Sequence, residues 1–353
     1  MYEHSQALRW AEQGRVPDAF IRAGIRRMLR ERLRELRDFD AAAGAEFSDS
    51  FVRGMREAEV APLPERANEQ HYEVPAEFFT RILGQHCKYS ACWWPEGVIT
   101  LDEAEAAALR VTCERAGIAD GQDVLELGCG WGSLSLWIAQ TCPASRITAV
   151  SNSRSQREYI EGEALKRGLS NLRVLTADMN VFEAPGRYDR VVSVEMFEHM
   201  RNWPELFRRV SVWLRPQGRF FMHVFAHRST PYAFVERDAS DWMSRHFFSG
   251  GMMPSDGLAT LFQDDLRLLR HWRWNGTHYE RTANAWLENM DTRRAEIWPQ
   301  LEHTYGRGAA ALWWMRWRIF FMSCAELFGY ERGARWWVSH YVFEPRTPGE
   351  RDG

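Results

Sequence analysis

The sequence predicts an α/β protein built on a doubly wound, mostly parallel sheet of seven strands. Two observations support this fold class. From residue 123 onward, short apolar runs alternate with stretches of helical periodicity, which is typical of parallel strands joined by crossover helices. A glycine-rich loop directly follows the first of these runs and opens a helix, so it can present free backbone N–H groups to a ligand.

The amino-terminal region, residues 1–66, is predicted to be helical. Between Pro17 and Arg37, apolar residues recur at spacings of three and four among many arginines. A helix packed on the rest of the protein, with a solvated basic face, is the first interpretation, and a helix lying on a membrane surface is the alternative. The proline-punctuated segment 61–64 then forms a linker to the main domain.

The main domain is predicted over residues 67–343, followed by a tail over 344–353. Its strands are apolar and rich in branched or aromatic residues. They are expected at Asp123–Leu127, Arg146–Val150, Arg173–Thr176, Tyr188–Val194, Gly218–Phe225, Leu268–Trp274 and Val338–Phe343. Helices are expected at Ser133–Ala139, Ser155–Arg167 and Pro204–Leu214. A largely helical insertion, about 228–335, would cap the site at the open end of the sheet.

Composition limits the classes of function. A chain of 353 residues, 45% hydrophobic and 26% charged, can bury a large core. The net charge of -3, without a basic run interleaved with aromatics, argues against a nucleic-acid partner. We expect a cytosolic location, since the amino terminus lacks the apolar core of a signal peptide and no apolar stretch could span a bilayer. The six cysteines have no zinc-like spacing, so no metal site is expected.

Three polar residues follow the fourth predicted strand: Glu195, Glu198 and His199. If the chain turns helical there, residues three and four apart share a face, and two carboxylates and an imidazole can enter one pocket. Such a cluster can accept and donate protons. The alternative is an ordinary helix start, with acidic residues at its positive end and a histidine bonded to the backbone.

The glycine-rich loop contains Gly128, Gly130 and Gly132, where the backbone can approach a ligand closely. A dinucleotide fingerprint places a further glycine or alanine where this chain has Ser133, and an acidic residue after the second strand. That strand instead runs into residues 151–153, which are Ser-Asn-Ser. A nicotinamide-dependent enzyme is therefore disfavoured.

The motifs VLELGCGWGSLSLWIA at 124–139 and ADMN at 177–180 resemble the cofactor loops of S-adenosylmethionine-dependent methyltransferases, and the chain resembles the cyclopropane fatty acid synthase superfamily. Within it, the chain is most similar to the coclaurine N-methyltransferase family. The motifs carrying this similarity are HYEVPAEFF from 71, KYS from 88, EMFEHM from 195, FFSGGMMPS from 247, FQDD from 262, NGTHY from 275, WRIFFMSCAELFGY from 317 and WWVSHYVF from 336. The resemblance extends over 69–343 and implies a class I, Rossmann-like methyltransferase fold, S-adenosylmethionine as cofactor and a homodimer.

The resemblance also implies roles for cofactor-binding residues. It places the methionine part of the cofactor against Gly128, Gly130 and Gly132, with its amino acid end held by Tyr89 and Ser90. The ribose would lie near Asn152 and Gln156, and the adenine near Asp178 and Met179. An amide can bond sugar hydroxyls and a carboxylate can accept from the adenine amino group. Asn152 could instead be a turn residue and Asp178 a helix cap.

Two departures from the cyclopropane synthases bear on the methyl acceptor. Those enzymes hold a bicarbonate base, and the resemblance maps its site onto Glu198, His223, Tyr279 and a cysteine that is Ala91 here. They also carry a glycine where this chain has Glu195. An added carboxylate repels an anion and attracts a cation. The expected substrate is therefore a small-molecule amine with an aromatic or otherwise apolar body.

An aliphatic amine titrates near pKa about 9 to 10, so it must lose a proton before its nitrogen can attack. We expect Glu195 to anchor the ammonium and the pair Glu198 and His199 to accept the proton. The acceptor pocket is expected to include His223, Tyr279, Trp317, Trp336 and His340, each of which could instead be ordinary core. Two alternatives stay open: modification of unsaturated phospholipid acyl chains at a membrane surface, and a catalytically silent cofactor-binding protein.

Overall fold

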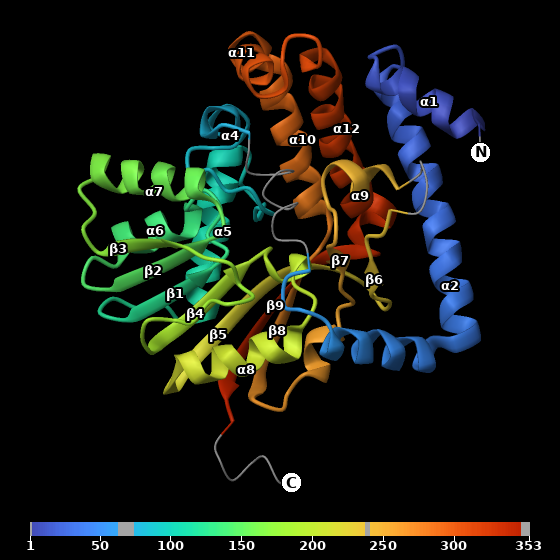
Figure 1. The fold of residues 1–353 in the computed structure, drawn as a ribbon. Helices are drawn as coiled ribbons and strands as arrows, with labels where there is room; N and C mark the ends of the chain where they lie inside the picture. Colours follow the sequence, from blue (N-terminus) through green and yellow to red (C-terminus); the bar gives the residue numbers. More distant parts are fainter. Residues whose placement is uncertain (1, 63–73, 237–240, 347–353) are drawn as a thin grey trace.

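The computed structural model describes residues 2–62, 74–236 and 241–346 (Figure 1). Its centre is a seven-stranded sheet of order β3-β2-β1-β4-β5-β9-β8. The strands are β1 (Asp123–Leu127), β2 (Arg146–Ser151), β3 (Leu172–Thr176), β4 (Tyr188–Val194), β5 (Leu214–His227), β8 (Leu266–Trp274) and β9 (Trp336–Pro345). β9 pairs antiparallel with both of its neighbours, and the other pairs in this sheet are parallel. The mostly parallel sheet predicted from the sequence is thus confirmed.

Helices cover both faces of the sheet (Figure 1). Val124 and Val192 pack in a cluster with α5 (Leu101–Ala116) and α6 (Ser133–Thr141), whereas Leu125 and Val191 pack in a cluster with α8 (Trp203–Trp213). α7 (Arg154–Lys166) covers β2 and β3. Because neighbouring residues of a strand point to opposite faces and both faces are buried, these strands are apolar throughout.

The start of β5 differs from the prediction. A helix ending at Leu214 and a separate strand from Gly218 were expected, but β5 begins at Leu214, immediately after α8. Leu214 pairs with Tyr188, and the register then shifts before Arg190 pairs with Arg219. A Cβ on Gly218 would lie 3.0 Å from the carbonyl oxygen of Tyr188, so the irregular segment needs a glycine there. A local irregularity of this kind leaves no periodic signal.

The carboxyl edge of the sheet is covered by α10 (Thr277–Thr292), α11 (Arg294–Tyr305) and α12 (Ala310–Gly329), with α4 (Ala76–Ile82) beside them (Figure 1). Shorter elements complete this part: β6 (Tyr232–Ala233), α9 (Trp242–His246), β7 (Met252–Met253), η2 (Leu258–Leu261) and η3 (Tyr330–Gly333). Aromatic side chains of these helices, among them Trp242, Trp286, Trp314 and Trp317, are buried together in one core cluster.

The amino-terminal region consists of α1 (Tyr2–Glu12) and α2 (Asp18–Glu57). α2 packs on α12, and its residues Ile21 and Leu33 are buried in the same core cluster as the apolar face of α12. Arg22 and Arg26 on the same helix each bond a carboxylate oxygen of Glu326, at 3.0 and 2.8 Å. This is the packed helix that the periodicity predicted. Among the described residues, no helix combines the length and apolarity needed to cross a bilayer.

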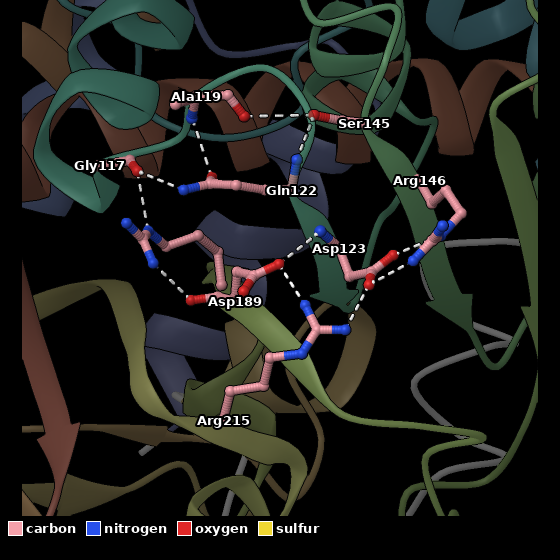
Figure 2. Close-up of polar contacts among 9 residues, drawn as sticks. Gly117, Ala119, Gln122, Asp123, Ser145, Arg146, Asp189 and Arg215 are labelled. Atoms are coloured by element: carbon pink, nitrogen blue, oxygen red, sulfur yellow. Dashed lines mark hydrogen bonds and ion pairs between the residues drawn. The ribbon is translucent and has the colours of Figure 1, made fainter.

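The opposite edge of the sheet, at the amino ends of β1 and β4, is held by an ion-pair network (Figure 2). Asp123 accepts hydrogen bonds from Arg146 (2.6 Å) and Arg215 (2.5 Å). Arg215 also bonds Asp189, which accepts from the backbone N–H of Asp123 at 2.8 Å. These charges lie at the far end of the strands from the glycine loop, so they belong to the scaffold.

Candidate active site

The order of the strands reverses between β1 and β4, and ligands of such sheets bind outside the carboxyl ends at that point. The glycine loop lies there. Gly128 has φ of 76°, and a Cβ on it would lie 2.5 Å from Cγ of Met196. Gly132 has φ of 78°, and a Cβ on it would lie 2.6 Å from Ile160. Both conformation and space therefore require glycine at these two positions.

Two adjoining cavities open on this loop. Residues lining both are Gly128, Gly130, Gln156 and Glu195.

The predicted cofactor residues divide between these cavities. The larger is lined by Asn152, Asp178 and Met179, and the smaller by Tyr89 and Ser90. Gly132 lines neither and instead packs under Ile160 at the start of α6.

Gln156 offers an observation that fits a bound ligand. Its Oε1 accepts a hydrogen bond from Ser151 at 2.7 Å, whereas its buried Nε2 has no partner in the part of the chain that the structure describes. A buried donor without a partner costs about 1 to 3 kcal/mol, which a hydroxyl-bearing ligand in the cavity would relieve.

Sequence reasoning missed three residues at this site. Lys88 is buried, and its Nζ bonds Ser90 Oγ and the carbonyl oxygen of Ala91, each at 2.6 Å. Burial raises the pKa of Glu126, in β1, to about 7, although a bond from Ser135 opposes this. Ala61 lines the larger cavity. A carboxylate inside an otherwise apolar strand is the signal that could have identified Glu126.

The sequence pattern suggested that the chain continues from β4 directly into an α-helix, but it does not. Glu195 lies in the left-handed region, with φ of 49°, and a short 3-10 helix, η1 (Phe197–His199), follows. Glu195 lines both cavities and His199 lines the larger one, where its ring stacks on Phe248 at 4.3 Å.

Glu198 lines neither cavity and is fully buried. Its Oε1 accepts from the backbone N–H of Phe225 at 2.8 Å, and its Oε2 is buried without a partner among residues 2–62, 74–236 and 241–346. Burial, and then the charge of Glu195, raise the pKa of Glu198 well above its ordinary value. The two carboxyl groups therefore titrate as a coupled pair.

The Glu195 carboxylate is held by hydrogen bonds from three sides. Its Oε1 accepts from the backbone N–H of Ala91 (2.8 Å) and lies 3.1 Å from Nε2 of His223, and its Oε2 accepts from the hydroxyl of Tyr279 (2.7 Å). Its side chain is only 9% exposed. Burial raises the pKa of Glu195, while the charge of Lys88 and the bonds from Ala91 and Tyr279 oppose that rise.

The other residues expected around the acceptor are deeper. Trp317 is fully buried, with its ring 4.8 Å from that of Phe78, and Trp336 donates its indole N–H to the Tyr232 hydroxyl at 3.1 Å. His340 lies behind His223, on β9. Neither cavity is lined by Trp317, Trp336 or His340.

The doubly wound sheet with one reversed strand, the glycine loop and the cleft at the switch point together define an S-adenosylmethionine-dependent methyltransferase of class I. Residues 63–333 match the family described as mycolic acid cyclopropane synthetase, and the chain belongs to this family.

Several known proteins are similar to the chain. (S)-coclaurine N-methyltransferase of Thalictrum flavum subsp. glaucum is 38% identical over 345 residues, which cover 97% of this chain and 96% of the relative. The crystal structure of coclaurine N-methyltransferase bound to N-methylheliamine and SAH has a TM-score of 0.90 at 36% identity, covering 96% of this chain and 99% of the other. A cyclopropane synthase of Mycobacterium tuberculosis shares the fold, with a TM-score of 0.66 at 20% identity, covering 80% of this chain and 98% of the other.

Proposed function

We propose that the protein transfers a methyl group from S-adenosylmethionine to the nitrogen of a small-molecule amine with an aromatic or otherwise apolar body. The main observation in support is the Glu195 carboxylate, which is held by Ala91, His223 and Tyr279 where the two cavities meet. The names of the similar proteins, which specify N-methylation, support the same reaction.

S-adenosylmethionine, when bound, supplies an electrophilic methyl group on a sulfonium sulfur. We assign its adenosine part to the larger cavity, beside Asp178 and Gln156, and its amino acid end to the smaller one, beside Tyr89 and Ser90. The unpartnered Nε2 of Gln156, within the described chain, suits a sugar hydroxyl. Glu195 would then lie next to the reacting methyl group, because it lines both cavities.

Glu195 can bind a cationic amine in this position. A carboxylate has about four lone-pair positions, and three hydrogen bonds leave one for an ammonium N–H. The low exposure of the carboxylate strengthens the attraction, because the pair would form largely out of water.

The ammonium must lose a proton before nitrogen can attack, which costs about 3 to 4 kcal/mol at neutral pH for an aliphatic amine. We assign this proton to the pair Glu198 and His199. His199 lines the larger cavity and so can meet the amine, while the raised pKa of Glu198 brings the basicity of that carboxylate closer to the amine's. Once nitrogen is neutral, the remaining contribution of the protein is alignment.

Modification of phospholipid acyl chains is the second candidate, and the Glu195 carboxylate argues against it. The resemblance assigns the bicarbonate of cyclopropane synthases to a site that includes His223 and Tyr279. Here those two side chains bond Glu195 instead. The chain supplies its own anion, so its activity should not depend on dissolved bicarbonate.

The test is incubation of the purified protein with S-adenosylmethionine labelled in the methyl group. One arm contains secondary and tertiary amines, the other vesicles of unsaturated phospholipid, each with and without bicarbonate. We expect label on an amine nitrogen at a rate independent of bicarbonate. Label in lipid would favour the second candidate, and cofactor binding without any transfer would favour a silent binding protein.

A homodimer, which rests on the resemblance alone, and a cytosolic location, which rests on the sequence, are also part of the proposal. Light scattering after gel filtration tests the dimer, because a particle of twice the 41.3 kDa chain mass is expected. Fractionation of cells that express the protein tests the location.

A further inference from the structure

A chain of three hydrogen bonds extends from the surface of α5 to the Glu195 carboxylate. Arg115 NH1 lies 2.9 Å from Nδ1 of His340, Nε2 of His340 lies 3.0 Å from Nδ1 of His223, and Nε2 of His223 lies 3.1 Å from Oε1 of Glu195. The two histidines face each other as register partners on β5 and β9, and both are fully buried.

The direction of these hydrogen bonds follows from their first member. A guanidinium can only donate, so Nδ1 of His340 must accept. Burial lowers the pKa of both histidines well below the ordinary value, so each is neutral and carries one ring proton. His340 therefore holds its proton on Nε2 and donates to Nδ1 of His223. His223 in turn holds its proton on Nε2 and donates to Glu195.

Arg115 is well placed to act as the fixed donor. It lies in the last turn of α5, where a cation interacts favourably with the helix dipole. Its guanidinium lies over the rings of Trp272 and Trp274, at 5.0 and 5.7 Å from their centroids. These contacts leave the guanidinium little freedom to turn away from His340.

We propose that Arg115 and His340 are positioning residues that set the tautomer of His223, so that Glu195 always receives an N–H donor and remains an anion able to bind a cationic amine. This proposal rests on the proposed N-methyl transfer and adds two residues that touch neither cavity. With the opposite tautomer, a ring lone pair would face the carboxylate, and the repulsion would favour protonation of Glu195.

Other groups also act on this carboxylate and must be held constant in any test. Glu195 interacts electrostatically with Lys88, Cys92, Glu198, Tyr279 and Cys324. The histidine pair is also close to Lys88, Arg115 and His271. The variants below change none of these groups except Arg115 itself.

The experiment compares His340→Leu, which removes both ring nitrogens, with His340→Gln, whose amide can accept from Arg115 and donate to His223. Arg115→Met removes the first donor. Nitrogen NMR of the histidine-labelled protein reports the tautomer of His223, and the pH dependence of kcat/KM for the amine reports the ionisation of Glu195.

We expect His223 to carry its proton on Nε2 in the wild type and His340→Gln, and to populate both tautomers in His340→Leu and Arg115→Met. The acid limb of kcat/KM should move up by about one pH unit in the latter two, as expected when a charged group loses a hydrogen bond. At pH values below this limb, kcat/KM of these two variants should be about tenfold lower than that of the wild type. His340→Gln should stay near wild type.

Two results would overturn the proposal. One is an unchanged His223 tautomer in both Arg115→Met and His340→Leu. The other is equal impairment of His340→Gln and His340→Leu with an unshifted pH profile, which would mean that His340 only fills space. The NMR measurement needs no amine, so it tests the proposed positioning even if no tested amine is methylated.

Discussion

Glu195 combines a strained backbone with a well-bonded side chain. A non-glycine residue in the left-handed region costs about 1 kcal/mol, and this residue has φ of 49°. The conformation turns its carboxylate toward Ala91, His223 and Tyr279, whose hydrogen bonds offset the cost. Strain of this kind is often retained where it places a functional group.

Replacement of this carboxylate should uncover an empty anion site. In Glu195→Gly the backbone strain is relieved, but three donors face a void the size of a carboxylate. We expect amine affinity to fall about tenfold or more, as loss of a partly buried charge partner should produce, while cofactor affinity stays unchanged by calorimetry. Added formate should restore part of the amine affinity. Undiminished affinity for the amine would exclude the anchoring role.

Loss of the buried carboxyl of Glu198 should affect turnover rather than cofactor binding. Glu198→Ala removes a proton acceptor, and such groups contribute about 100-fold or more to rate. Single-turnover rates with saturating amine from pH 6 to 9 measure the loss, and calorimetry measures cofactor affinity. Glu161→Ala, at an exposed glutamate of α7, is the control. Equal rates in wild type and Glu198→Ala would show that the assignment is wrong.

At the level of single residues, the sequence predicted which side chains lie at the site better than it predicted the directions in which they point. The resemblance singled out His223 and Tyr279, and both bond Glu195. The positive φ at Glu195 separates its side chain from that of Glu198, which a helical spacing rule could not anticipate. The importance of Lys88 depends on its burial among distant segments, which no local pattern records.

At the level of elements, Asp256 connects the loop before η2 with β8 and β9. It is buried and accepts hydrogen bonds from Arg273 at 3.0 Å, Trp337 at 2.8 Å and Ser339 at 2.7 Å. Burial alone would raise the pKa of Asp256, but His271 and these bonds hold it well below the ordinary value. The carboxylate is therefore a stabilising group of the outer strands.

Asp256→Asn should lower the free energy of unfolding by about 2 kcal/mol at neutral pH, because it removes a buried carboxylate that accepts charge-assisted hydrogen bonds. Because the pKa of Asp256 is lower in the folded protein than in the unfolded chain, the carboxylate stabilises the fold fully at pH values above its unfolded pKa. The difference in unfolding free energy between wild type and variant should therefore be constant down to about pH 5 and shrink below about pH 4. Urea titrations of both proteins at pH values from 7 to 3.5 measure this difference in unfolding free energy. Asp264→Asn, at a carboxylate that is 72% exposed, should change stability by less than about 0.5 kcal/mol. A pH-independent difference would contradict this account.

The strands were predictable because both faces of the sheet are buried. β1 and β4 begin and end at the predicted residues, since an apolar run bounded by charged and glycine residues leaves little choice of boundary. The extension of β5 back to Leu214 depends on an irregular pairing with Tyr188 and on space around Gly218. Such pairing is a tertiary property, so the helix pattern before it could not reveal it.

At the level of the whole molecule, α2 links the helices over the sheet to the larger cavity. It packs on α12 near its start, and the segment after it places Ala61 in the wall of the larger cavity. Asn180 holds this segment by bonds to the N–H and carbonyl of Ala61, at 2.8 and 2.9 Å. The predicted boundary after residue 66 lies outside the described residues, but the segment just before it contributes Ala61 to the wall of the larger cavity.

Packing of α2 on α12 also bears on membrane binding. Ile21 and Leu33 are buried, although Phe20 is 70% exposed. We expect no sedimentation of the protein with anionic phospholipid vesicles at physiological salt, because a surface helix needs a free apolar face. Phe20→Ser is the matched variant. Sedimentation of the wild type that is lost in Phe20→Ser would instead support contact with a membrane surface.

The left-handed backbone at Glu195 has an evolutionary consequence. The resemblance places glycine at this position in cyclopropane synthases, and glycine is the residue that adopts such a conformation without cost. A glycine codon GGA or GGG becomes a glutamate codon by substitution of its middle base. A single nucleotide change is therefore enough to exchange glycine for a carboxylate at this position, and the main chain already has the conformation that both residues share here.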